Sequence, residues 1–198
     1  MEEVFNALID SFVVDKVGIA NDFLSSEMTS RLRANLTNFY SQNKLRSAGI
    51  GNHILTDVQK SIRTDVIYWL DRAHNDPVEN DFFDLMDAFV LHLNRTCYTG
   101  ITGYEFHYAL YEKGSFYKKH LDQFRNNESR QYSMILYLNE DWTQGDGGEL
   151  CIYPEHKAAQ SISPTNGKSV FFKSSDMEHE VLLTNKPRMS ITGWLKIN

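Results

Sequence analysis

The sequence has little of what membrane-spanning and nucleic-acid-binding proteins need. Its 198 residues contain no apolar run near the roughly 20 residues that a membrane-spanning helix requires. Lysine and arginine are scattered without a basic run, and the formal net charge is −6. We therefore expect neither a nucleic-acid partner nor a membrane partner.

Cysteine is also scarce. The two cysteines, Cys97 and Cys151, form neither a CxxC motif nor a disulfide framework, so we expect two buried, reduced thiols. The opening stretch MEEVFNALIDSF is acidic and amphipathic, and it lacks the basic start and unbroken apolar core of a secretory signal. A cytoplasmic protein is the expectation that follows.

Apolar residues make up 41% of the chain and charged residues 23%, which is ordinary for a globular protein. No repeat or low-complexity linker divides the sequence, so we expect one domain over residues 1–198. Its two parts differ in texture, with a helical support and substrate loop in residues 1–100 and a strand-rich core in residues 101–198.

The first part carries apolar residues at helical spacing. Residues 4–14, 25–42 and 81–98 each show the 3.6-residue period of a helix with one buried face, and Ser25 or Ser26 can cap the second of them. Residues 18–24 are short and extended. The polar, glycine-punctuated residues 43–71 predict a long loop or a short hairpin.

The second part changes to short runs rich in tyrosine, phenylalanine, valine and isoleucine, separated by turn signals such as QGDGG and TNGK. Six to eight such runs at even spacing are typical of a sandwich or a jelly-roll barrel. Because helices precede strands, the fold class is α+β. A jelly roll has an open mouth in which side chains from several strands can converge on a ligand.

One strand-like stretch, FYKKHLDQF, holds a candidate metal-binding pair. Residues two apart in a strand face the same side, so His120 and Asp122 project together with Lys118, while Tyr117 and Leu121 turn away. Alone, this pair is more simply explained as polar surface residues. With His179 from a later strand it becomes two histidines and one carboxylate, the ligand set of non-haem iron(II) oxygenases.

The last strand adds a second candidate feature. Arg188 follows His179 by nine residues and shares one strand face with Ser190, Thr192 and Trp194. If that face points inward, the arginine needs a buried anion, and a guanidinium grips a carboxylate well. The alternative is that this face meets water, and that the opposite residues Ile191, Gly193 and Leu195 point inward.

The order His-x-Asp, His, and then Arg nine residues later with ITGW resembles the 2-oxoglutarate and iron(II)-dependent dioxygenases. Within them the chain is similar to the intracellular, oxygen-sensing type of prolyl 4-hydroxylase and its bacterial relatives. The runs SIRTDVIYWL, ILYLNEDW, GGELCIYPE and HEVLLTNKPRMSITGW extend the resemblance over most of the chain. Nucleic-acid demethylases share the triad but usually carry a different arginine pattern.

The resemblance implies a double-stranded β-helix, the cupin-like jelly roll, with N-terminal helices packed against it. It implies that His120, Asp122 and His179 hold iron(II). Arg188 and the hydroxyl of Tyr137 would then bind the distal carboxylate of 2-oxoglutarate. Three further positions match the family's pocket: Thr192 as a hydrogen-bonding neighbour, Tyr111 near the metal, and Trp194 as an aromatic wall. Ordinary strand packing is the alternative for both tyrosines.

Two charged residues match a pair that in this family ties the loop before the barrel to the rim of the site. We expect Asp65 and Arg130 to form that pair, with residues 46–61 as a lid over the substrate. His107 faces the same side as Tyr111, and we expect it to line the barrel rather than to bind the metal. The remaining histidines receive no role: His53, His74, His92 and His156.

By resemblance, the function is hydroxylation of a prolyl residue of an intracellular protein, with O2 and 2-oxoglutarate as co-substrates. Succinate and CO2 are the co-products, and ascorbate is a supporting reductant. An oxygenase acting on another amino-acid side chain or on a small molecule is the alternative. A jelly-roll binding module without catalytic activity is a further one.

Overall fold

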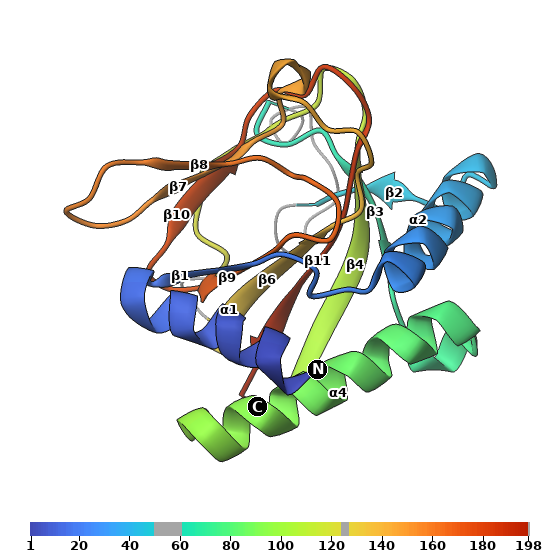
Figure 1. Ribbon diagram of the computed structural model, residues 1–198. Helices are drawn as coiled ribbons and strands as arrows, with labels where there is room; N and C mark the ends of the chain where they lie inside the picture. Colours follow the sequence, from blue (N-terminus) through green and yellow to red (C-terminus); the bar gives the residue numbers. More distant parts are fainter. Residues whose placement is uncertain (50–60, 124–126, 198) are drawn as a thin grey trace.

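Two antiparallel sheets face each other in the computed structural model, and helices cover the outer face of the larger sheet (Figure 1). The structure describes residues 1–49, 61–123 and 127–197. The larger sheet has the strand order β1-β9-β6-β11-β4-β3-β2. Its strands are β1 (Val17–Ala20), β2 (Arg46–Ser47), β3 (Val66–Trp69), β4 (Gly103–Tyr111), β6 (Arg130–Tyr137), β9 (Ser169–Lys173) and β11 (Arg188–Lys196).

The smaller sheet has the order β5-β10-β7-β8 and completes the jelly roll. Its strands are β5 (Tyr117–His120), β7 (Leu150–Tyr153), β8 (Gln160–Ile162) and β10 (Glu178–Val181). The fold is therefore the α+β jelly roll expected from the sequence. Short 3-10 turns, η1 (Arg72–His74) and η2 (Gln144–Asp146), lie in two of its connections.

The helices are α1 (Glu2–Asp15), α2 (Ser26–Ser41) and α4 (Pro77–Cys97), close to the ranges expected from the apolar period. Ser25 caps α2 by accepting a hydrogen bond from the Met28 amide at 3.2 Å. Asp76 caps α4 in the same way, through the amides of Val78 and Glu79, and Pro77 fits the first turn. Local capping signals therefore place the starts of α2 and α4.

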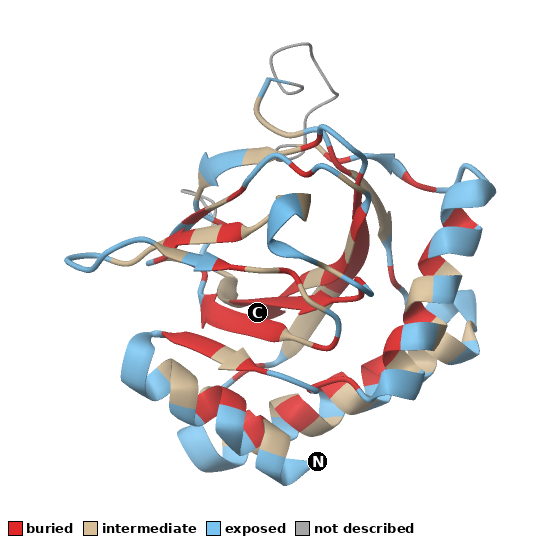
Figure 2. Cartoon of the chain, turned by 45° about the horizontal axis from the view of Figure 1, so that its top comes forward, coloured by how far each residue is buried: buried red, intermediate tan, exposed pale blue. Residues whose placement is uncertain are grey.

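The larger sheet has a hydrophobic core on each face. On its outer face, helical residues such as Leu8, Leu36 and Phe89 pack against strand residues such as Phe171. Figure 2 shows this as buried helix faces turned toward the sheet and exposed faces turned away. The inner face packs against the smaller sheet through a second core that includes Ile152. The candidate site opens between the two sheets.

Strand β11 is buried on both faces, so both expectations for it hold in part. Ile191 and Leu195 are fully buried against the helices, while Arg188 and Ser190 are equally buried on the side of the second sheet. Gly193 permits this close packing, because a Cβ atom there would lie 2.2 Å from the Phe106 ring.

Three other expectations meet the structure with different results. Both cysteines are free, but Cys97 is exposed and Cys151 only half-buried, so the expected burial is wrong. The segment 43–71 contains the short antiparallel pairing of β2 with β3, while residues 50–60 of the expected lid lie outside the described residues. Within the described part of the chain, no helix is long and apolar enough to cross a bilayer.

Candidate active site

The structure brings His120, Asp122 and His179 together at the edge of the smaller sheet. His120 ends β5 and lies opposite His179 of β10 in the antiparallel register, so their ring centroids are 4.3 Å apart. Asp122 follows just after the strand. One ligand atom from each residue lies within 4.8 Å of the others. Two imidazoles and a carboxylate at this spacing can hold one divalent cation.

The side chains of β5 do not alternate between its two faces as expected. The pairing of His179 with His120 and of Val181 with Tyr117 leaves one extra residue in β5, which is a bulge. The bulge turns Tyr117 to the same side as His120, and the two rings stack at 3.6 Å. The expectation that Tyr117 points away from the pair was therefore wrong.

Both histidines are oriented through one ring nitrogen. Nδ1 of His120 donates to the Lys118 carbonyl at 2.7 Å, and Nδ1 of His179 donates to the Met177 carbonyl at 3.0 Å. Each ring therefore presents Nε2, which lies 3.5 Å (His120) or 3.6 Å (His179) from a carboxylate oxygen of Asp122. Such backbone contacts select the tautomer in which Nε2 is free to bind a metal.

The protonation states also suit a cation. Burial raises the pKa of Asp122, but the two histidines and the Ser133 hydroxyl outweigh burial and hold it well below its usual range. Ser133 donates to Asp122 Oδ2 at 2.7 Å. Burial lowers the pKa of His179, which keeps its imidazole neutral. An ionised carboxylate and a neutral imidazole are the forms that bind metals.

Arg188 lies toward the other end of the same space. It is 1% exposed, and its Nε donates to the Gly148 carbonyl at 2.9 Å. Its guanidinium lies 4.9 Å from the ring centroid of Tyr111 and 5.0 Å from that of Tyr137. No carboxylate of the described residues pairs with it, and its Nη2 has no hydrogen-bond partner. A buried positive charge is thus left for an anion.

Of the expected neighbours of Arg188, Tyr111 and Tyr137 lie beside its guanidinium, whereas Thr192 lies four residues further along β11, opposite His107. Tyr137 is fully buried, and its hydroxyl has no partner among the described residues. Burial raises the pKa of Tyr137 despite the charge of Arg188, so the hydroxyl keeps its proton and can donate it in a hydrogen bond. Tyr111 lies opposite Arg188 in the register of β4 and β11. The Thr192 hydroxyl lies 3.4 Å from that of Ser190.

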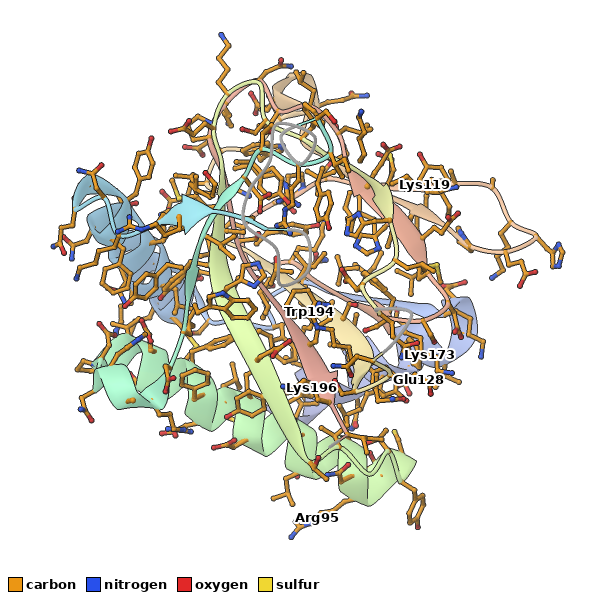
Figure 3. The ribbon with its side chains drawn as sticks, turned by 180° about the vertical axis from the view of Figure 1, so that it is seen from behind. Arg95, Lys119, Glu128, Lys173, Trp194 and Lys196 are labelled. Carbon is orange, nitrogen blue, oxygen red and sulfur yellow. The ribbon has the colours of Figure 1, made fainter. Side chains whose placement is uncertain are left out.

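Aromatic residues form the outer part of the site. Trp194, labelled on β11 in Figure 3, is buried and has no partner for its indole N–H within the described chain. The guanidinium of Arg130 covers its ring at 3.4 Å. Trp69, on β3, is 45% exposed and marks the boundary with solvent. A cavity of about 340 Å³ connects these residues to the metal-binding trio and to Arg188.

The expected pair of Asp65 with Arg130 does not form. Asp65 is buried and receives two hydrogen bonds from Arg63, at 2.7 Å and 2.6 Å. Arg130 instead donates to Glu105 at 2.8 Å. Arg63 and Asp65 are two residues apart in an extended segment, so their side chains point to the same side. Arg63 therefore pairs with the Asp65 carboxylate.

Four residues of the site were not found from the sequence. Ser133 shares its parity with Ile135 and Tyr137 on β6, and this alternation could have indicated it. The other three are Tyr117, Arg63 and Trp69. The role of Tyr117 depends on the bulge, which leaves no regular pattern in the sequence. Arg63 and Trp69 alternate with Asp65 and Ile67 in SIRTDVIYWL, and this alternation could have indicated them.

The comparisons with known proteins agree with this geometry. Residues 106–196 match the family model of the 2OG-Fe(II) oxygenase superfamily. A prolyl-4-hydroxylase from Pseudomonas putida has a similar structure, with a TM-score of 0.88 and 30% sequence identity over 98% of this chain and 99% of that chain. The chain belongs to the 2OG-Fe(II) oxygenase superfamily, a class of iron-dependent dioxygenase enzymes.

Two further proteins are similar to parts or all of the chain. A prolyl hydroxylase from Trichoplax adhaerens, in complex with a peptide fragment of hypoxia inducible factor, shares the fold with a TM-score of 0.87 and 23% identity over 98% of this chain and 90% of that chain. Prolyl 3-hydroxylase OGFOD1 from Xenopus laevis is 35% identical over 77 residues. That match spans 34% of this chain and only 15% of the relative's length.

The donor sets fit the groups that this superfamily uses. The His-Asp-His trio offers an open-sided nitrogen and oxygen site of the kind that iron(II) prefers. The unpaired guanidinium of Arg188 and the unpartnered hydroxyl of Tyr137 match a carboxylate, which 2-oxoglutarate carries at its far end.

The ion pair between Asp65 and Arg63 predicts which substitutions are energetically coupled. Asp65→Asn should lower the free energy of unfolding by about 3–5 kcal/mol, because it leaves Arg63 partly buried without its counter-charge. Double-mutant cycles in urea, with Arg63→Met and with Arg130→Met, measure the coupling. We expect strong coupling to Arg63 and less than about 0.5 kcal/mol to Arg130. Strong coupling of Asp65 to Arg130 and weak coupling to Arg63 would instead support the Asp65–Arg130 pair that the family resemblance implies.

Metal binding predicts a shift in melting temperature. Anaerobic addition of Fe(II) or Co(II) to metal-stripped protein should stabilise the fold by about 2.7 kcal/mol at a hundredfold excess over Kd. His179→Ala should abolish the shift, and His156→Ala, at an exposed turn, should retain it. Equal shifts for both variants would place the metal elsewhere.

Proposed function

We propose that the protein is a 2-oxoglutarate- and iron(II)-dependent dioxygenase that hydroxylates a prolyl residue of an intracellular protein. One observation carries the proposal. A cavity connects the trio of His120, Asp122 and His179 to the unpaired Arg188. A metal site and a carboxylate site in one cavity are what a chelating keto acid with a distal carboxylate requires.

In this proposal the trio binds iron(II) through Nε2 of each histidine and one carboxylate oxygen of Asp122. The backbone contacts of Lys118 and Met177 hold the two rings in place. When bound, iron(II) and 2-oxoglutarate supply the oxidation, in which O2 gives one oxygen atom to the substrate and one to succinate, with release of CO2.

Arg188 binds the far carboxylate of 2-oxoglutarate, and the hydroxyl of Tyr137 donates to the same group. Tyr111 and Thr192 line the wall between this end and the metal. Gly148 accepts from Nε of Arg188 and leaves the outer nitrogens for the ligand. Burial excludes water from the charge pair, which strengthens it.

The likeness over the full length of the Pseudomonas putida prolyl-4-hydroxylase supports prolyl hydroxylation. The Xenopus laevis relative is named a prolyl 3-hydroxylase, so the ring carbon that is oxidised is a separate question. The Trichoplax adhaerens structure holds a peptide fragment, and the exposed Trp69 at the mouth of the cavity suits a segment of polypeptide. The unpaired Cys97 and Cys151 support a reducing, cytoplasmic compartment.

Removal of one hydroxyl tests the 2-oxoglutarate site. Tyr137→Phe should raise the Kd for 2-oxoglutarate about tenfold, because it deletes one hydrogen bond to a charged group. Its stability without ligand should not fall, because the hydroxyl has no partner in the described structure. Titration of the Mn(II)-loaded protein measures Kd, and urea unfolding measures stability. Tyr108→Phe, equally buried but on the helix-facing side of β4, is the matched control for ligand binding. Equal Kd values for the two variants would remove Tyr137 from the ligand site.

The function itself is tested with purified protein, iron(II), 2-oxoglutarate, ascorbate and a lysate of its own cell. We expect succinate release together with the gain of one oxygen atom on a proline, located to C3 or C4 by mass spectrometry and NMR. The His179→Ala variant should show neither.

Other outcomes point to the alternatives. Succinate release with oxygen added to another side chain, or to a small molecule, would replace the prolyl substrate and keep the oxygenase. No turnover in the wild type, with or without lysate, would leave a binding module without catalytic activity.

A further inference from the structure

The strand register arranges the inward side chains in layers. His107 of β4 lies opposite Trp69 on β3 and Thr192 on β11. Tyr111 lies opposite Arg188, four residues further along β4, which is about 13 Å at the usual rise of a strand. His107 is therefore well separated from the carboxylate end of the site and lies on the side of the exposed Trp69.

The surroundings of His107 are aromatic and leave its polar atoms unused. The ring lies 5.0 Å from the Trp69 ring and 5.5 Å from the Trp194 ring, and the residue is 3% exposed. Nδ1 is buried without a partner, and no hydrogen bond of the described residues involves this side chain. An unsatisfied buried polar group destabilises a fold by about 1–3 kcal/mol, which an apolar residue in its place would avoid.

His107 is not a fourth metal ligand, because the cluster of ligand atoms in the described chain contains only the other three residues. Burial first, and then the charges of Arg63 and Arg130, lower its pKa to about 3 against the opposing effect of Asp122. The imidazole is thus neutral at physiological pH and carries one N–H donor and one acceptor. It can form a hydrogen bond without bringing a charge into the cavity.

We propose that His107 determines substrate specificity by donating its ring N–H to a backbone carbonyl of the peptide that carries the target proline. This inference rests on the proposed function. Proline has no backbone N–H, so the peptide bond that precedes it can form a hydrogen bond only through its carbonyl oxygen. Trp69, which is 45% exposed, offers a flat apolar face for the ring, and His107 packed beside it offers a neutral hydrogen-bond donor.

Two variants distinguish the effect of the His107 hydrogen bond from the effect of the shape of its ring. His107→Phe retains an aromatic ring between the tryptophans and removes the donor. His107→Asn restores an N–H near the position of Nδ1. The substrate is a fixed mixture of acetylated and amidated pentapeptides with a central proline. The readouts are peptide-dependent succinate release, the KM for 2-oxoglutarate, succinate release without peptide, and the melting temperature.

For His107→Phe we expect kcat/KM for the peptides to fall about tenfold, the value of one neutral hydrogen bond. The KM for 2-oxoglutarate and the release without peptide should match those of the wild type. The melting temperature should not fall, because the apolar ring removes the unsatisfied Nδ1. His107→Asn should recover most of the peptide-dependent rate, which a purely structural role would not produce.

Three results would overturn the inference. Equal peptide-dependent rates for the wild type and His107→Phe would show that no hydrogen bond is made. A higher KM for 2-oxoglutarate in His107→Phe would assign the residue to the co-substrate side. A wild type that turns over 2-oxoglutarate without any stimulation by the peptides would contradict the proposed function, and this inference with it.

Discussion

The site depends on one electrostatic constraint, the burial of the Arg188 charge with no carboxylate beside it. A guanidinium that is 1% exposed needs an anion, and among the described residues its recorded hydrogen bond goes to a neutral carbonyl. The protein tolerates this because the strands around Arg188 are held from both sides, by the helices on one face and by the second sheet on the other. The stability of the two cores therefore maintains a cavity with an unpaired positive charge, which suits a carboxylate.

Each of the two sheets contributes different residues to the site. The smaller sheet presents the histidines, and the larger sheet presents Arg188, Tyr137 and the hydroxyl of Ser133 that supports Asp122. Asp122 follows β5, and its carboxylate accepts the hydrogen bond of Ser133 from the larger sheet, so the packing of the two sheets sets the separation of the trio from Arg188.

A series of contacts also joins the segment before the barrel to the metal-binding trio. Asp65 holds Arg63, the guanidinium of Arg63 lies 4.2 Å from the Tyr117 ring centroid, and Tyr117 stacks on His120. Arg63, Trp69 and Gly49 line the cavity, so this segment forms part of its mouth. This segment is thus connected through Tyr117 to His120, a candidate ligand of the metal.

The sequence by itself determined the helices, the change to strands and the side chains that share a strand face, because caps and periodicity act between residues close in the chain. It also indicated the trio and Arg188 through their order and spacing. Only the tertiary structure decided that Asp65 binds Arg63 rather than Arg130, that a bulge turns Tyr117 inward, and that both faces of β11 are buried. These three outcomes depend on which residues come together when the sheets pack. Which residues meet in this way cannot be read from the spacing of residues along the chain.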